Sequence, residues 1–118
     1  MKKKVLIVDD AAFVRYSLRQ TLEKYGFEVV GEACDGKSCI KLFQQLNPDI
    51  VTLDITMPEM DGIEVLKKIM EIDKNAKVVM ITALGQEEKV KEAVLNGAKG
   101  FIVKPYKEEH LVKVLSSL

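Results

Sequence analysis

The chain has 118 residues, of which 47% are hydrophobic, and its 18 lysine and arginine residues balance its 18 aspartate and glutamate residues. This length supports one domain over residues 1–118 with a core of its own, and the balanced charge provides no basic field for direct nucleic-acid binding. The apolar run near the N-terminus is too short to span a membrane, and the two cysteines fit no disulfide framework, so we expect a cytoplasmic location. We also expect a monomer.

Five apolar runs alternate along the chain with stretches of helical spacing. The expected strands are residues 3–9, 28–33, 50–54, 77–82 and 100–104. The first, third and fifth runs are almost continuously apolar, which is typical of strands buried on both faces. The alternation predicts an α/β fold in which helices cover both faces of a mostly parallel sheet.

The stretches between the strands each carry one apolar stripe at helical spacing. In chain order the stripes are Val14, Leu18, Leu22 and Tyr25; Cys39, Leu42, Phe43 and Leu46; Val65, Leu66, Ile69 and Met70; Val90, Ala93 and Val94; and Leu111, Val114, Leu115 and Leu118. Asp61 followed by Glu64 predicts a capped start for the third helix, and Gly26 and Gly97 suit left-handed helix ends.

Polar residues stand where four of the expected strands end. Asp9 and Asp10 follow the first apolar run, Asp54 ends the third, and Thr82 and Lys104 end the last two. Ligands of open parallel sheets bind at this edge, so we expect these side chains to form a site. Oxygen ligands with no nearby histidine or thiolate favour Mg²⁺, with Mn²⁺ as a second possibility.

Three carboxylates in one site repel one another. Two like charges about 4 Å apart cost roughly 4 kcal/mol at an effective dielectric constant near 20, so a cationic group is needed. A divalent ion and the Lys104 ammonium would supply it and would keep Asp54 ionised and able to attack phosphorus. The sequence therefore predicts a site for a divalent cation and a phosphoryl group.

Four motifs carry a resemblance to the response regulator receiver domain family, with CheY-like single-domain regulators as the nearest form. They are IVDD at residues 7–10, DITMPEMDG at 54–62, ITALG at 81–85 and FIVKPY at 101–106. The resemblance covers the whole chain and implies a flavodoxin-like (βα)5 three-layer sandwich with strand order 2-1-3-4-5. It also implies a phosphorylation-activated switch in a two-component signalling system of the chemotaxis type.

Position in these motifs implies a role for each residue. Asp54 resembles the phosphoacceptor, which takes a phosphoryl group from the phosphohistidine of a sensor histidine kinase or a phosphotransfer domain. Asp9, Asp10, Asp54 and the Thr56 backbone carbonyl resemble the Mg²⁺ ligands, with Asp10 the direct ligand of the acidic pair. Lys104 would pair with the phosphoryl oxygens, and the peptide bond that follows it is usually cis in this family.

The switch itself is expected at two further residues. Thr82 resembles the hydroxyl that turns toward the phosphoryl group, and Tyr106 the aromatic that turns into the space that Thr82 leaves. We expect a partner, such as a flagellar switch protein, to detect the change on the face formed by residues 86–118. Apolar Leu84 and Thr56 stand at positions that tune attack by water, so we expect slow self-dephosphorylation and no enzymatic turnover.

Simpler roles remain open for each residue. Asp9 and Asp10 could cap a helix, Asp54 could be an ordinary strand-end residue, and Thr82 suits a strand by propensity alone. Tyr106 could be a static surface aromatic, and Lys104 a solvated charge.

Other functions remain open as well. A haloacid-dehalogenase-type phosphatase needs a DxDxT signature, whose second aspartate is missing at residue 56, and a flavodoxin-type FMN carrier needs a phosphate-binding loop where Asp9 and Asp10 stand. Within the receiver family, the chain could be a phosphate-relay carrier or a domain cut from a larger regulator with a DNA-binding output. The position of the first motif near the N-terminus favours a stand-alone regulator.

Overall fold

The computed structural model describes residues 2–57 and 61–118, so the centre of the DITMPEMDG motif lies outside the described residues. One sheet contains the strands β1 (Lys4–Val8), β2 (Glu28–Ala33), β3 (Ile50–Asp54), β4 (Val78–Ala83) and β5 (Gly100–Lys104). Their order is β2-β1-β3-β4-β5, and every neighbouring pair is parallel. The expected strand order is confirmed, and β1 and β4 differ from their predicted bounds by one residue at each end.

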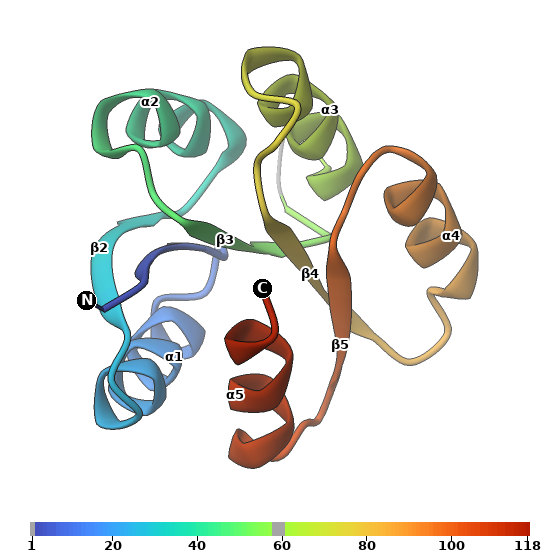
Figure 1. The fold of residues 1–118 in the computed structure, drawn as a ribbon. Coiled ribbons are helices and arrows are strands. Elements are labelled where there is room, and N and C mark those ends of the chain that lie inside the picture. The colour runs from blue at the N-terminus through green and yellow to red at the C-terminus, as the bar shows by residue number, and fades with distance from the viewer. Residues whose placement is uncertain (1, 58–60) are drawn as a thin grey trace.

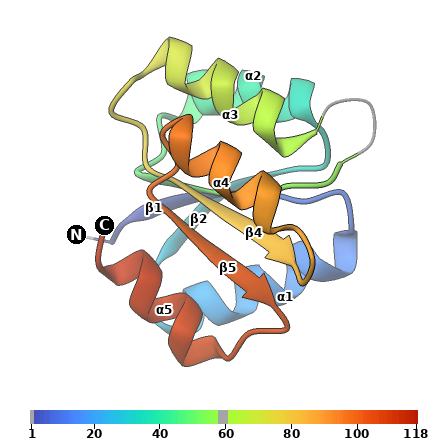
Figure 2. The same ribbon diagram turned by 90° about the vertical axis from the view of Figure 1, so that its right-hand side faces the viewer.

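The helices form a layer on each face of this sheet. They are α1 (Ala12–Lys24), α2 (Gly36–Leu46), α3 (Gly62–Ile72), α4 (Glu87–Leu95) and α5 (Glu108–Ser116). Seen from the side, α1 and α5 cover one face of the sheet, while α2, α3 and α4 cover the other (Figures 1 and 2). The three-layer sandwich is therefore confirmed. Among the described helices, none combines the length and the apolar character that crossing a bilayer requires.

Each face of the sheet has its own apolar core, because successive strand residues point to opposite faces. In β1, Val5 and Ile7 pack in the cluster under α1 and α5, whereas Leu6 and Val8 pack in the cluster under α2, α3 and α4. The helices close the first cluster with Leu18, Leu22, Leu111 and Leu115, and the second with Cys39, Phe43, Leu66 and Ile69. The polar residues begin at the carboxyl edge of the sheet, and the second cluster continues past the end of β3 through Ile55 and Met57.

The fifth strand is less buried than its composition predicts. β5 lies at the edge of the sheet with β4 as its neighbour, and Phe101 remains 45% exposed. The expectation that this run is buried on both faces is therefore wrong. β4, by contrast, is buried from Val78 to Thr82, because it lies between β3 and β5.

Two residues of the predicted helix stripes are exposed. Tyr25 is the C-cap of α1 and lies past its last turn, and Phe27 packs in the core instead. Val94 is exposed because α4 turns Ala93 toward the sheet. The predicted helix ends are confirmed, since Asp61 caps α3 by accepting from the Glu64 N–H at 2.9 Å and the two predicted glycines have φ angles of 90° and 104°.

Candidate functional site

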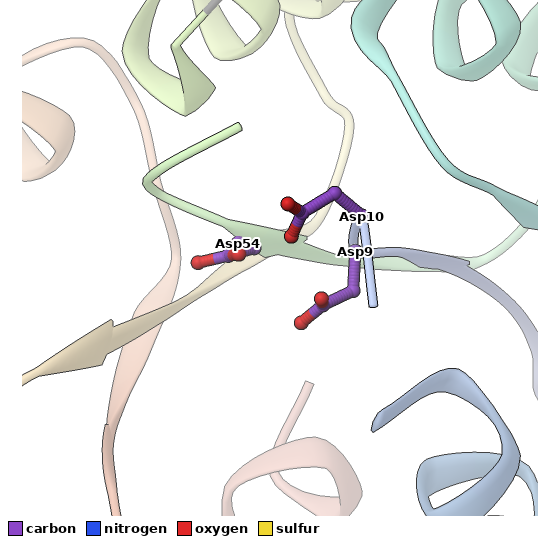
Figure 3. A group of neighbouring side chains, drawn as sticks. All are labelled: Asp9, Asp10 and Asp54. Atoms are coloured by element: carbon purple, nitrogen blue, oxygen red, sulfur yellow. The ribbon is translucent and has the colours of Figure 1, made fainter. Parts of the chain in front are cut away.

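Three carboxylates meet at the carboxyl edge of the sheet, as the sequence predicts. Asp9 and Asp10 follow β1 and Asp54 ends β3, and these strands are neighbours whose register pairs Val8 with Leu53. One carboxylate oxygen from each aspartate lies within 4.8 Å of the others, and Figure 3 shows the three side chains gathered at this edge. Asp9 is buried, Asp54 is half-buried and Asp10 is exposed, so the group opens to solvent on one side.

Asp9 is held by contacts from three directions. Its Oδ1 accepts from the Ala11 N–H at 2.9 Å, and its Oδ2 lies 3.5 Å from Lys104 Nζ. Its backbone carbonyl accepts from Arg15 Nη1 at 2.7 Å, and Arg15 in turn pairs with Glu32 of β2. These contacts hold the loop after β1 in place. The N-cap of α1 is Ala11, so helix capping does not account for the position of Asp9.

Asp54 has a pKa raised to about 6. Partial burial is the main cause, because it penalises the charged form, and the neighbouring Asp9 carboxylate raises the pKa further. Lys104 and the Thr56 N–H, which donates to Asp54 Oδ1 at 3.3 Å, lower it. A cation among the carboxylates would lower the pKa of Asp54 again, since it would remove the repulsion that raises it.

Gly62 lets the start of α3 approach Asp54 closely. Its N–H donates to the Ile55 carbonyl at 2.6 Å, and an added Cβ would collide with the Asp54 carbonyl oxygen and lie 2.7 Å from Ile55 Cα. Both obstacles are backbone atoms, which cannot move aside by changing a rotamer. A residue without a side chain is therefore required beside the end of β3.

Thr82 and Lys104 lie beside the acidic group on the next strands. Asp54 pairs with Ile81, so Thr82 stands one residue beyond it on β4, and Lys104 of β5 pairs with Ala83. Thr82 is buried, and its hydroxyl donates to Gln86 Oε1 at 2.8 Å. The peptide bond after Lys104 is cis, as expected.

Phe101, and not Tyr106, shares a surface with Thr82. Thr82, Leu84, Val90 and Phe101 line a depression of about 260 Å³ between β4, α4 and β5. Tyr106 is half-buried and packs on the opposite face of the sheet, against the cluster under α1 and α5. Tyr106 follows the end of β5, and burial and then the nearby Asp9 carboxylate raise its pKa, so it also lies close to the acidic group.

The donor set fits a hard divalent cation. Asp9, Asp10 and Asp54 offer carboxylate oxygens, and no histidine or cysteine belongs to the cluster of possible ligands found among residues 2–57 and 61–118. Such a set suits Mg²⁺ or Mn²⁺, with water and phosphate oxygens completing the coordination. The same carboxylates would repel the phosphate of FMN, which disfavours a flavodoxin-type carrier.

Sequence reasoning missed four residues of this region. Arg15 and Gly62 position the acidic side chains, while Gln86 and Phe101 lie beside Thr82. Phe101 could have been found from strand alternation, because it and Val103 point to the face opposite Ile102. The role of Gln86 depends on how its loop folds and has no sequence signal of its own.

Comparison with known proteins gives a consistent result. A family model described as the response regulator receiver domain matches residues 5–116. The chemotaxis protein CheY of Thermotoga maritima is 51% identical to the chain over 118 residues, which cover all of this chain and 98% of that protein. CheY of Bacillus subtilis is 47% identical over 116 residues, which cover 98% of this chain and 97% of the relative.

A solved structure with a similar fold is the CheX-CheY-BeF3-Mg²⁺ complex from Borrelia burgdorferi. Its matching chain superposes with a TM-score of 0.92 at 47% identity, and the match covers 98% of this chain and 87% of that one. The likeness extends over both helical layers and the sheet.

Proposed function

This chain belongs to the response regulator receiver domain family, and we propose that it is a phosphorylation-activated switch of the chemotaxis type with Asp54 as its phosphoacceptor. The observation that carries the proposal is the approach of three carboxylates to within 4.8 Å at the strand ends, with Lys104 paired to one of them. A structural role alone does not account for so costly a cluster of like charges.

Asp54 acts as the nucleophile. One of its carboxylate oxygens attacks the phosphorus of a phosphohistidine on a histidine kinase or phosphotransfer domain. The new O–P bond forms as the P–N bond breaks, and the departing imidazole keeps the electron pair and takes up a proton. With a pKa of about 6, about nine-tenths of Asp54 is ionised at pH 7, so the nucleophile is available without a separate base.

Asp9, Asp10, Asp54 and the Thr56 carbonyl are the groups that would hold Mg²⁺. When bound there, Mg²⁺ supplies positive charge that offsets the carboxylates and the phosphoryl oxygens. Lys104 orients toward the same oxygens from β5, where its pair with Asp9 holds it at the site. The Borrelia burgdorferi neighbour, whose complex contains BeF3 and Mg²⁺, supports this assignment.

Labelling by a small phosphodonor tests the proposal. Incubation with radiolabelled acetyl phosphate and Mg²⁺ should label the wild-type protein, and Asp54→Asn should reduce labelling by at least about 100-fold because the nucleophile is lost. Asp73→Asn changes an exposed aspartate at the end of α3 and should label like the wild type. Equal labelling of Asp54→Asn, or labelling that is indifferent to removal of Mg²⁺ by EDTA, would contradict the proposal.

The response is transmitted through β4, α4 and β5. A phosphoryl group on Asp54 offers strong acceptors, so Thr82 turns toward it. An aromatic ring then moves into the space that opens, either Tyr106, as its motif implies, or Phe101 of the adjoining depression. The nearby surface suits a protein partner, since Leu84 is 78% exposed, Leu95 is 87% exposed and Phe101 is 45% exposed. Partners of this kind are a kinase, a phosphatase, a flagellar switch protein, or a protein like the CheX of the Borrelia burgdorferi complex.

Two alanine variants distinguish the aromatic residues. If Tyr106 is the ring that moves, Tyr106→Ala should uncouple partner binding from beryllofluoride and Phe101→Ala should not, and if Phe101 moves, the pattern should be reversed. Pull-down of a flagellar switch protein with and without beryllofluoride provides the measurement. Partner binding that stays dependent on beryllofluoride in both variants would contradict a switch role for either ring.

Self-dephosphorylation is expected to be slow. Leu84 is exposed beside the depression next to Thr82 and offers no group that could orient an attacking water. Leu84→Glu should shorten the half-life of the phosphorylated protein, as measured by loss of the label after the donor is removed.

A further inference from the structure

Gln86 ties the Thr82 hydroxyl to the loop that follows Asp54. Its Oε1 accepts from Thr82 Oγ1 at 2.8 Å and from the Ala83 N–H at 2.9 Å. Its Nε2 donates to Thr56 Oγ1 at 3.0 Å. The Ala83 N–H can only donate, so the amide oxygen must face it, and the amide nitrogen must therefore face Thr56. One side chain thus bridges the segments that follow β3 and β4.

The backbone of Gln86 begins a helix that its side chain does not cap. Gln86 is the N-cap of α4, and its carbonyl accepts from the Val90 N–H at 3.0 Å. Its side chain makes no capping hydrogen bond, because both polar ends are directed to the phosphorylation site. A Ser, Thr, Asp or Asn side chain at this position would ordinarily satisfy a free N–H of the first helical turn. Here that stabilisation is forgone in favour of the bridge.

The bridge occupies donors that a phosphorylated site would use. The Thr82 hydroxyl carries one hydrogen, so while it donates to Gln86 it cannot donate to a phosphoryl oxygen on Asp54. Its other acceptor, the Ala83 carbonyl, is more distant at 3.2 Å. Since Thr82 is buried, water does not readily replace Gln86.

We propose that Gln86 is a positioning residue that holds Thr82 in its resting orientation and must release it before the switch can turn. The inference rests on the proposed function, because it assumes that Asp54 becomes phosphorylated. It also links the site to α4: Gln86 lines the depression that Phe101 shares. Release of its side chain frees the N-cap residue of α4 when Asp54 is phosphorylated.

Beryllofluoride, a mimic of the aspartyl phosphate, measures this restraint. Gln86→Met keeps the side-chain length and removes both polar ends, and Gln44→Met on the exposed side of α2 is the matched control. In the presence of Mg²⁺, the half-saturating beryllofluoride concentration should fall about three- to tenfold in Gln86→Met, as expected when one or two restraining hydrogen bonds are lost. It should not change in Gln44→Met. A value for Gln86→Met within twofold of wild type, or higher, overturns the proposal.

Amide hydrogen exchange provides a readout without ligand or metal. The Ala83 N–H should exchange several-fold faster in Gln86→Met than in the wild type or in Gln44→Met, because its acceptor is gone. Unchanged exchange at Ala83 overturns the proposal. Thr56→Val removes one end of the bridge and should lower the beryllofluoride requirement less than Gln86→Met. The double variant should equal Gln86→Met alone, since both changes break one bridge.

The two measurements separate this inference from the proposed function. If wild type and Gln44→Met both fail to bind beryllofluoride, the proposed function fails, and Ala83 exchange still decides whether Gln86 restrains Thr82. If both bind it and Gln86→Met binds no more tightly, the site is a phosphoacceptor and the restraint by Gln86 is rejected.

Discussion

Asp54 and Thr82 lie on neighbouring strands, yet the segments that carry them are packed differently. Asp54 ends a strand whose four preceding residues are buried, and α3 covers it with five buried residues. Beyond Thr82, Ala83 and Leu84 are exposed, and α4 buries only Ala93 among its described residues. The acidic group is held by a core on both faces, whereas the segment after Thr82 rests on little apolar contact.

This contrast separates chemistry from response. Phosphoryl transfer needs carboxylates that stay in place, and the buried strands β1 and β3 supply that rigidity. A switch needs a segment whose rearrangement costs little, and regions with few buried apolar contacts open most easily. The two requirements are met on adjacent strands, with Gln86 connecting them.

Two glycine variants give the largest expected difference between these regions. Gly62→Ala should lower the free energy of unfolding by about 3 kcal/mol, because the new Cβ meets fixed backbone atoms beside Asp54. Gly85→Ala, in the loop after Thr82, has open space and should cost only about 1 kcal/mol through its positive φ. Urea denaturation measures both values. Equal costs would show that the end of β3 is no more rigid than the loop after β4.

The free energy of unfolding should also depend on pH through Asp54. Its pKa is about 6 in the folded protein and 3.8 as the ordinary value, so the folded state binds more protons between these values and stability falls as pH rises through them. Asp54→Asn should therefore stabilise the protein by about 1–2 kcal/mol at pH 7.5, after allowance for solvent screening, and by almost nothing near pH 4.

Urea titrations in EDTA at the two pH values check this prediction, with Asp73→Asn as the control. Addition of Mg²⁺ at pH 7.5 should stabilise the wild-type protein and not Asp54→Asn to the same degree, because part of the ligand set is lost. A gain for Asp54→Asn that is the same at both pH values would show that repulsion and burial of its charge are not the cause.

Much of the acidic site formed by Asp9, Asp10 and Asp54 could be predicted from the sequence. Parallel strands end at one edge, so apolar runs followed by Asp9, Asp10 and Asp54 predict a cluster of carboxylates, provided that the strands are neighbours, as β1 and β3 are. The strand order did not follow from the pattern and came from family resemblance. The apolar composition of β5 predicts a strand buried on both faces, and this prediction is wrong. An edge strand and a central strand can have similar composition, so composition alone does not distinguish them.

The residues that respond to phosphorylation, around Thr82, were harder to predict. The motif predicts Tyr106 as the switch aromatic, but nothing in the motif indicates that Phe101 shares a depression with Thr82. The contacts of Gln86 depend on the path of the loop after β4. Residue types near the strand ends therefore predict the phosphorylation site, but they do not predict which side chains move when the site is phosphorylated.

Two threonines provide a smaller test of the same contrast. Thr52 is fully buried in β3 and its hydroxyl has no hydrogen-bond partner among the described residues, whereas the Thr82 hydroxyl donates to Gln86. Thr52→Val should raise the free energy of unfolding by about 1 kcal/mol, because it removes an unsatisfied buried hydroxyl at nearly constant shape. Thr82→Val should give no gain in the same urea experiment, and a gain as large as that of Thr52→Val would question the Gln86 contact.

The smallest effect on stability is expected on α4. Leu95 is 87% exposed, so Leu95→Ala should change the free energy of unfolding by less than about 0.5 kcal/mol. Thermal or urea unfolding measures it. A loss above 1 kcal/mol would mean that α4 is anchored more firmly than its exposed side chains indicate.

The ion pair between Asp9 and Lys104 joins residues 95 positions apart in the chain. A ribosome-bound polypeptide that has completed β3 already carries all three carboxylates of the cluster, yet it lacks the Lys104 ammonium that balances them until β5 has docked. Competence to receive phosphate should thus appear only after β5 has been made and has docked, and chains that still lack β5 should not divert signal from those that have it.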